Sequence, residues 1–183
     1  MNLIKKQIFT AAACMLVAFP VFASDAAMPA PPAVSAELEK MRSLSGNWEG
    51  MSKSSHESQQ LAAAQYKVTS GGSTVIETLF PGTSQEMVTV YHDEGGELVV
   101  THYCMLGNQP KLKLKSAEEG HLIFELTKES SEVLAGQMHM HSLDLEFKKD
   151  GGLTQTWTAE DGKGSLMSST VIVLNKTLNE YTA

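Results

Sequence analysis

Hydrophobic and polar residues alternate along most of the chain after Gly46. Residues 111–115 read Lys-Leu-Lys-Leu-Lys, and residues 122–126 and 143–147 place apolar side chains at every second position. A period of two is typical of β-strands that bury one face. The pattern predicts about ten strands, near residues 46–52, 64–70, 73–80, 85–92, 97–105, 110–116, 121–127, 138–148, 153–160 and 164–174.

Turn signals separate these segments, among them Gly71-Gly72, Pro81-Gly82, Gly95-Gly96 and Asp161-Gly162. Connections of hairpin length predict an antiparallel up-and-down order. A sheet of ten strands must curl or split, and closing it removes the exposed edges. We therefore expect an all-β fold, an antiparallel up-and-down barrel of about ten strands.

Two stretches between predicted strands are longer than a hairpin turn. Residues 53–63 are polar with a late alanine run, and residues 128–137 form a second long connection. We expect the first to be a loop or a small helix, and both to lie where access to a barrel interior is controlled.

A short helix is expected before the first strand. Ser35 can cap it, and Leu38, Met41 and Leu44 recur at a spacing of three. Two or three turns are enough to plug one end of a barrel.

The first 23 residues have the pattern of a secretory signal. Lys5 and Lys6 precede an apolar stretch that ends in Val21-Phe22-Ala23, with small residues at the two positions that a signal peptidase reads. The predicted organisation is a signal peptide over 1–23, a flexible Ala- and Pro-rich leader over 24–34 and a barrel domain over 35–183. The mature protein would be periplasmic or secreted, without a membrane span; an uncleaved anchor, or a lipoprotein signal at Cys14, is the alternative.

Charge, cysteine content and missing motifs limit the classes of partner and reaction that we expect for this protein. The chain of 183 residues has 14 basic and 21 acidic residues, a net charge of -7 that argues against nucleic acid as a partner. Signal removal would leave Cys104 as the single cysteine, so no internal disulfide is expected. The sequence contains no Gly-rich phosphate loop, no Gly-x-Ser-x-Gly and no His-Glu-x-x-His.

The segment 44–50, Leu-Ser-Gly-Asn-Trp-Glu-Gly, follows the expected helix and opens the first strand. It resembles the calycin superfamily, and the ten-strand count is most similar to its fatty-acid-binding and nitrobindin-like haem proteins. The stretches 86–92, 101–104 (Thr-His-Tyr-Cys) and 107–110 (Gly-Asn-Gln-Pro) also resemble a group of exported bacterial proteins of unassigned function. The resemblance implies that Trp48 closes one end of the barrel and that the interior holds a small ligand, with haem among the candidates.

Several polar residues fall on faces that could line such an interior. Glu77 shares a face with Val75 and Leu79, where a carboxylate needs a partner or a raised pKa. His102 and Cys104 share a face with Leu98 and Val100. The predicted ligand-binding residues are these three, the tryptophan that the resemblance places at one end of the barrel, and two amides in the loop before Pro110. The full set is Trp48, Glu77, His102, Cys104, Asn108 and Gln109.

The stretch 137–141, Gln-Met-His-Met-His, predicts a different kind of site. Period two puts His139 and His141 on the face of Leu143, with Met138 and Met140 on the other face. Two histidines at this spacing can reach one transition-metal ion or supply an axial ligand to haem, if a third donor approaches. The alternatives are polar contacts to a bound ligand, or simply a pair of polar residues at the end of a strand.

The favoured function is a non-enzymatic exported protein that binds a small apolar or amphipathic molecule inside the barrel. An isomerase or hydrolase that uses Glu77, His102 or Cys104, and an interaction protein with a filled barrel, are the two alternatives.

Overall fold

The computed structural model describes residues 33–54, 58–118 and 120–177. The expected signal peptide and most of the expected leader lie outside these residues, so their predictions remain predictions.

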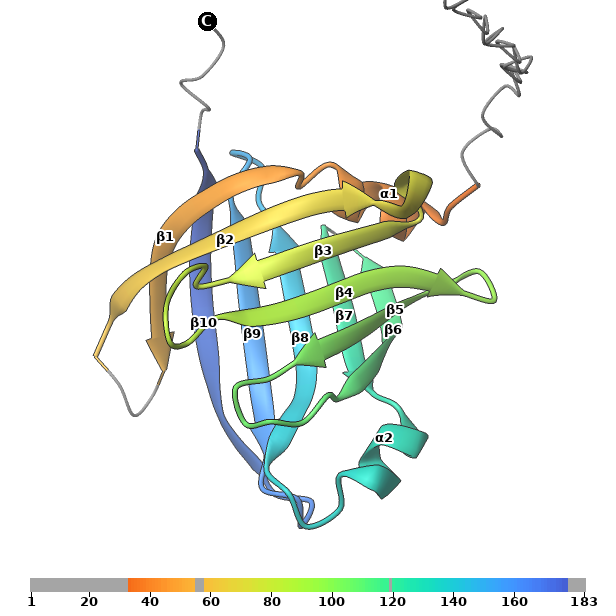
Figure 1. Ribbon diagram of the computed structural model, residues 1–183, viewed down its shortest axis with the longest axis vertical. Helices are drawn as coiled ribbons and strands as arrows, with labels where there is room; N and C mark the ends of the chain where they lie inside the picture. The colour runs from red at the N-terminus through yellow and green to blue at the C-terminus, as the bar shows by residue number, and fades with distance from the viewer. Residues whose placement is uncertain (1–32, 55–57, 119, 178–183) are drawn as a thin grey trace, which may run out of the picture. The chain divides into compact units, whose positions relative to one another are not determined.

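Ten antiparallel strands close into a barrel, as the alternation predicted (Figure 1). Each strand pairs with its neighbours in sequence, and β1 closes the barrel by pairing with β10. The strands are β1 (Gly46–Ser54), β2 (Gln60–Thr69), β3 (Thr74–Leu79), β4 (Met87–Glu94), β5 (Glu97–Tyr103), β6 (Lys111–Glu118), β7 (His121–Leu126), β8 (His139–Phe147), β9 (Leu153–Glu160) and β10 (Leu166–Lys176).

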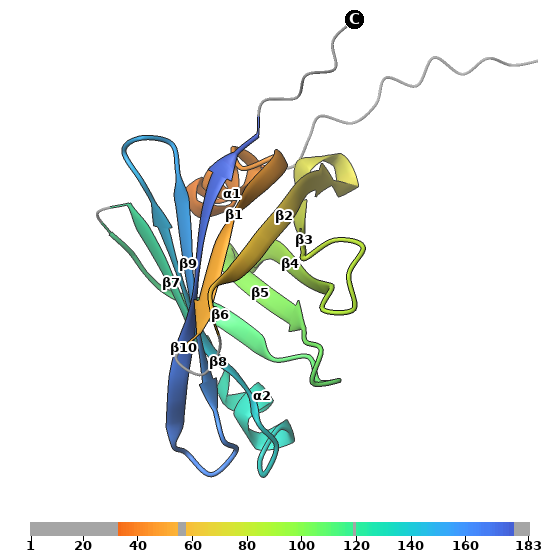
Figure 2. The ribbon, with the colours of Figure 1, turned by 90° about the vertical axis from the view of Figure 1, so that its left-hand side faces the viewer.

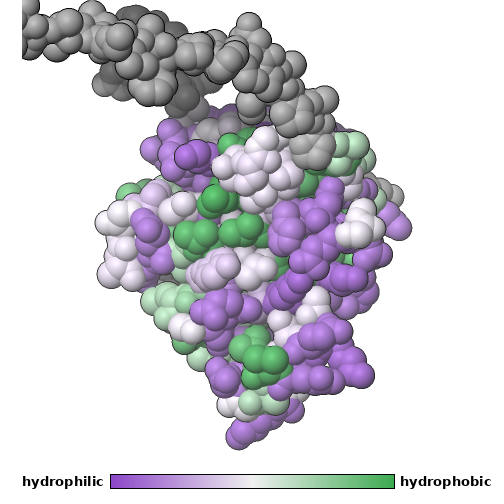
Figure 3. Space-filling model, turned by 45° about the vertical axis from the view of Figure 1, so that its right-hand side comes forward, coloured by the Kyte–Doolittle hydropathy of each residue, from purple (hydrophilic) through white to green (hydrophobic). Residues whose placement is uncertain are grey.

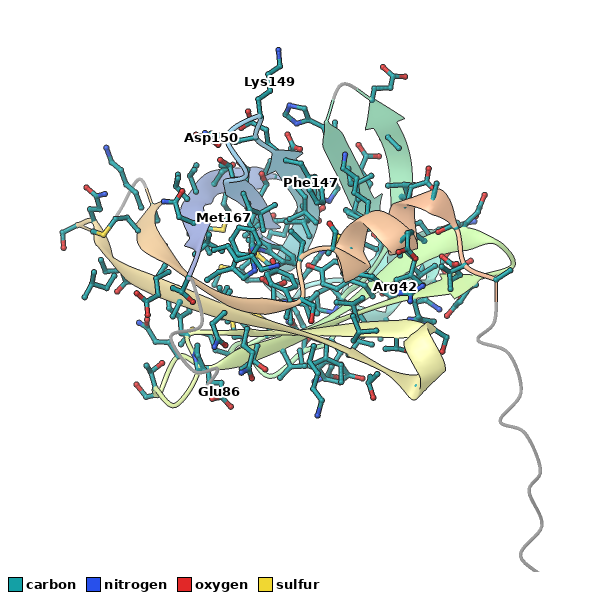
Figure 4. The ribbon with its side chains drawn as sticks, turned by 90° about the horizontal axis from the view of Figure 1, so that it is seen from above. Arg42, Glu86, Phe147, Lys149, Asp150 and Met167 are labelled. Carbon is teal, nitrogen blue, oxygen red and sulfur yellow. The ribbon has the colours of Figure 1, made fainter. Side chains whose placement is uncertain are left out.

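The expected helix, α1 (Ala36–Arg42), covers one end of this barrel. The Ser35 hydroxyl caps it by accepting from the Leu38 amide at 3.0 Å, and Leu38 and Met41 are buried. Figure 4 looks onto this end and shows α1 lying across the barrel, with Phe147 nearby. The Lys40 ammonium sits 4.2 Å from the centre of the Phe147 ring, so the plug is held by apolar and cation–π contacts.

The first of the two long connections differs from what the sequence predicted. β1 runs to Ser54 and β2 starts at Gln60, so most of the stretch 53–63 is strand and not loop. The late alanines made it look like a loop or helix, but Ala62 and Ala64 are buried as small inward residues of β2.

The second connection contains a short helix, α2 (Lys128–Val133), in addition to the one expected. The Thr127 hydroxyl caps it by accepting from the Ser130 amide at 3.2 Å. Figure 2 shows α1 and α2 at opposite ends of the barrel. Of the helices in the described ranges, neither has the length and apolar character that a membrane span requires.

Candidate functional site

A buried carboxylate lies in the barrel interior. Glu77 on β3 is fully buried and accepts from the hydroxyls of Tyr66 (2.8 Å) and Tyr91 (2.7 Å). The Gln155 amide nitrogen donates to the same carboxylate and also to the Tyr66 oxygen at 2.6 Å. We call Glu77, Tyr66, Tyr91 and Gln155 the Glu77 cluster; its members come from β3, β2, β4 and β9, which are brought together by closure of the barrel.

The electrostatics of the cluster follow from burial. Desolvation raises the pKa of Glu77, and hydrogen bonds from Tyr91, Gln155, Tyr66 and Thr89 oppose that rise. Desolvation also raises the pKa of both tyrosines, which therefore remain neutral donors. None of the buried residues in the described ranges is Lys or Arg, so hydrogen-bond donors, and not a counter-ion, stabilise the carboxylate.

A cavity of about 370 Å³ opens at the end of the barrel away from α1. We call it the mouth cavity. Its lining is mainly apolar and rich in methionine, with a few hydroxyls and amides at the rim. The side chains that line it include Met87, His102, Cys104, Met138, Met140 and Trp157.

His102 lines this cavity and has one ring nitrogen without a partner. Its ring is 1% exposed, and its Nδ1 lies 2.9 Å from the hydroxyl of Thr89, the directly opposite residue on β4. Its Nε2 is buried and unpaired among the described residues. The Trp157 ring lies against the imidazole, with 4.5 Å between ring centroids. Burial lowers the pKa of His102 to about 4, so the imidazole is neutral near pH 7.

Cys104 also lines the cavity, at the end of β5 beyond Tyr103. Burial raises the pKa of its thiol. A nucleophilic cysteine needs the opposite shift, because the thiolate is the reactive form. The structure therefore brings His102 and Cys104 to one cavity but does not give the thiol the activation that catalysis requires.

The other predicted ligand-binding residues lie elsewhere. Trp48 is at the α1 end, where its indole donates to the Leu44 carbonyl at 2.7 Å and its ring meets Tyr66 edge-on. The structure thus separates Trp48 from the mouth cavity by the length of the barrel. Glu77 lies between these two ends, behind the cavity wall.

Asn108 and Gln109 lie in the β5–β6 connection, on a groove beside α2 and not on the mouth cavity. The Asn108 amide donates to the Met138 carbonyl at 2.9 Å, which ties this connection to the segment before β8. The groove is larger, about 800 Å³, but its lining includes five charged side chains, three lysines and two glutamates, among them the exposed Lys113 and Glu129. Figure 3 shows hydrophobic patches set among hydrophilic side chains on one face of the molecule. Each site has a buried polar atom that is unpaired among the described residues, Asn108 Oδ1 in a residue of the groove and His102 Nε2 in a residue of the mouth cavity. We regard the mouth cavity as the stronger site because its lining is mainly apolar and lacks the charged side chains of the groove.

The expected faces of His139 and His141 are wrong. Met140 pairs with Ala159 and Ser142 with Thr158, so His141 is the extra residue of a β-bulge. The bulge reverses the alternation before Leu143, and Met138 and Met140 line the cavity in place of the histidines.

His139 is buried, with Nδ1 2.7 Å from the Gln137 carbonyl oxygen, whereas His141 Nδ1 lies 3.0 Å from a Glu160 oxygen. Within the described ranges, no three His, Cys, Asp or Glu side chains come close enough together to hold a metal ion. The two histidines therefore lack both the common interior face and the third donor on which the predicted metal site depended.

The sequence reasoning missed five residues of the site: Tyr66, Thr89, Tyr91, Gln155 and Trp157. Their signal was a polar or aromatic side chain at an inward position, such as Gln155 between Leu153 and Trp157. That signal shows that a partner is needed, but the partner itself depends on which strands face each other across the closed barrel.

Comparison with known proteins supports the fold. No protein-family model matches the sequence, and no curated protein matches it significantly. Among solved structures, the chain is similar to the crystal structure of Rv2717c from M. tuberculosis, with a TM-score of 0.52 and 15% sequence identity. The match covers 80% of this chain and 100% of that one. At this identity the likeness shows the barrel fold alone.

Proposed function

We propose that this chain is an exported, calycin-like binding protein that holds a small amphipathic molecule in the mouth cavity. The observation that carries the proposal is the unpaired, buried Nε2 of His102, a residue that lines an otherwise largely apolar cavity. Ligand sites of this kind combine apolar walls with a few polar groups that fix orientation. Export is supported by the signal-like pattern of residues 1–23.

The size of the cavity limits the ligand. About 370 Å³ lies near the lower end of the range for small-molecule sites, roughly 300–1,000 Å³. A short-chain or single-ring molecule fits, whereas a tetrapyrrole is larger than this space. His102 offers a neutral nitrogen, but the cavity does not fit haem, and we derive no function through it.

The pKa shifts of the Cys104 thiol and the His102 imidazole favour binding over catalysis. The Cys104 pKa is raised, and the His102 pKa of about 4 makes the imidazole a weak base. An unreactive polar contact in an apolar cavity suits a carrier or sensor of a small molecule.

The chain contains its own reporter for the test. It has two tryptophans, of which Trp157 lines the mouth cavity and Trp48 lies at the opposite end. In a Trp48→Phe variant, octan-1-ol should change the fluorescence of Trp157 in a saturable way. The matched Trp157→Phe variant, which keeps Trp48, should show no such change.

Native mass spectrometry of protein from cells that export it adds an independent readout. A co-purifying molecule small enough for the cavity supports the proposal. A bare protein whose Trp157 fluorescence does not respond to octan-1-ol would overturn it and favour an interaction protein with a filled barrel.

A further inference from the structure

The orientation of the Gln155 amide is fixed by its neighbour. The Trp157 indole N–H can only donate, and it lies 3.0 Å from Gln155 Oε1. The amide nitrogen therefore faces Glu77 and the Tyr66 oxygen. Since Tyr66 accepts from Gln155, its own proton is directed to Glu77.

The donors around Glu77 favour its ionised state. Its carboxylate faces the donors of Tyr66, Tyr91 and Gln155, and Glu77 is the sole partner of the Tyr91 hydroxyl in the described ranges. An ionised Glu77 accepts from all three donors at once, whereas a proton on the oxygen that faces Tyr91 would compete with the Tyr91 hydroxyl, which has no other acceptor among the described residues.

Thr89 connects this carboxylate to His102. It is the direct cross-strand partner of Glu77 on one side and of His102 on the other. Its hydroxyl has one proton to donate. Orphaned buried N–H groups are rare, so the imidazole proton lies on Nδ1, where the Thr89 oxygen can accept it, and not on the unpaired Nε2. The Thr89 proton is then directed away from His102.

We infer that Thr89 holds His102 as the Nδ1–H tautomer, so that Nε2 presents a lone pair to the mouth cavity and selects ligands with a hydroxyl donor. The ligand class rests on the proposed function; the tautomer does not. The ligand is an alcohol or phenol with an apolar body, whose O–H donates to Nε2 while the body lies among the methionines. An ether of the same size offers only an acceptor and leaves the lone pair unsatisfied.

The tautomer can be measured without any ligand. In ¹⁵N-labelled full-length protein, the imidazole ¹⁵N shifts of His102 should show a protonated Nδ1 and an unprotonated Nε2 near pH 7. Thr89→Ser keeps the hydroxyl and should preserve this pattern, whereas Thr89→Val removes the acceptor of the Nδ1 proton and should shift the ring toward the Nε2–H tautomer. A protonated Nε2 in the unaltered protein would overturn the inference.

The ligand class is tested with a pair of isomers, octan-1-ol and heptyl methyl ether. A net hydrogen bond of about 0.5–1.5 kcal/mol predicts that the alcohol binds roughly 2- to 10-fold more tightly. The preference should persist in Thr89→Ser and disappear in His102→Phe, which keeps an aromatic side chain without the nitrogen. Equal affinities in the unaltered protein would overturn the ligand class even if the tautomer is as stated. Failure of both isomers to bind would overturn the proposed function and, with it, the ligand class.

Discussion

The Trp157 indole donates to Gln155 Oε1 at 3.0 Å, and this one bond couples the wall of the mouth cavity to the buried carboxylate. Trp157 lies against His102 on the cavity side, and Gln155 reaches Glu77 on the other. A ligand that moves the indole therefore acts on a hydrogen-bond network and not only on an apolar surface.

Glu77→Gln should destabilise the fold although it keeps the shape of the side chain. The new amide nitrogen would face groups that are themselves donors, leaving buried polar atoms unpaired. Such a loss costs about 1–3 kcal/mol, and more for charged groups. Urea unfolding should show a lower midpoint with an unchanged slope. Glu118→Gln, at an exposed residue of β6, is the control and should change the midpoint little. Equal midpoints for the two variants would contradict the ionised Glu77.

His102 should make stability depend on pH in the acid range. Its pKa is about 4 in the folded protein and about 6.5 when unfolded, so the unfolded state binds more protons between these values. Stability therefore falls as pH drops from 6.5 to 4, by about 3 kcal/mol if the full shift is realised. The raised pKa of Glu77 acts in the opposite direction, because that group binds protons more readily in the folded state.

The comparison with His102→Gln isolates the histidine from Glu77. This variant cannot titrate at position 102, so its stability should fall less steeply between pH 6.5 and pH 4 than that of the unaltered protein. Parallel pH profiles for the two proteins would show that the His102 pKa is not lowered by folding.

Much of the architecture could be predicted because each strand carries its own local signal. Lys111 to Lys115 alternate with two leucines, and Gly95-Gly96 marks a hairpin without reference to the rest of the chain. Glu77 could be recognised as a carboxylate on an apolar face for the same reason. Its partners could not, since Gln155 is 78 positions away and reaches Glu77 only through the closed barrel.

The histidines show the limit of period-two reasoning. A single bulge at His141 moves every residue before it in β8 to the other face. No glycine marks that bulge between Gln137 and Phe147. The methionines that line the cavity were therefore predicted to face outward. Only the pairing with β9 shows the reversal.

Cys104 should react slowly with a thiol reagent, and ligand should slow it further. The thiol is nearly buried at the mouth cavity and its pKa is raised, so little thiolate is present near neutral pH. Cys14→Ser leaves Cys104 as the single thiol. Reaction with Ellman's reagent should be slow in the folded variant, fast in denaturant, and slower still with octan-1-ol. An unchanged rate at saturating octan-1-ol would place the ligand outside the mouth cavity.

Gly50→Ala should force the paired strands β1 and β10 apart locally and so lower the stability of the barrel. An added Cβ would lie 1.8 Å from the Val173 carbonyl oxygen, a backbone atom that cannot rotate away. The strands must separate locally, which we expect to cost about 3 kcal/mol, at the upper end for overpacking. Gly152→Ala is the matched control, because its Cβ would approach no atom closer than 3.2 Å and meets first a side-chain oxygen of Asp150. A thermal midpoint for Gly50→Ala equal to that of the control would contradict the close approach of the two strands.

Ser35→Ala should weaken the α1 end of the barrel without affecting the mouth cavity. The Ser35 hydroxyl accepts from the Leu38 amide and donates to Asp93 Oδ1 at 2.7 Å, so the variant loses both the helix cap and a tie to β4. Loss of an N-cap costs about 0.5–2 kcal/mol. Ser35→Thr keeps the hydroxyl and should retain most of the stability in urea. The affinity of Ser35→Ala for octan-1-ol should match that of the unaltered protein, since α1 and the cavity lie at opposite ends. If the affinity falls while Ser35→Thr binds normally, the ligand must reach through the barrel as far as α1, and the assignment of the site to the mouth cavity is wrong.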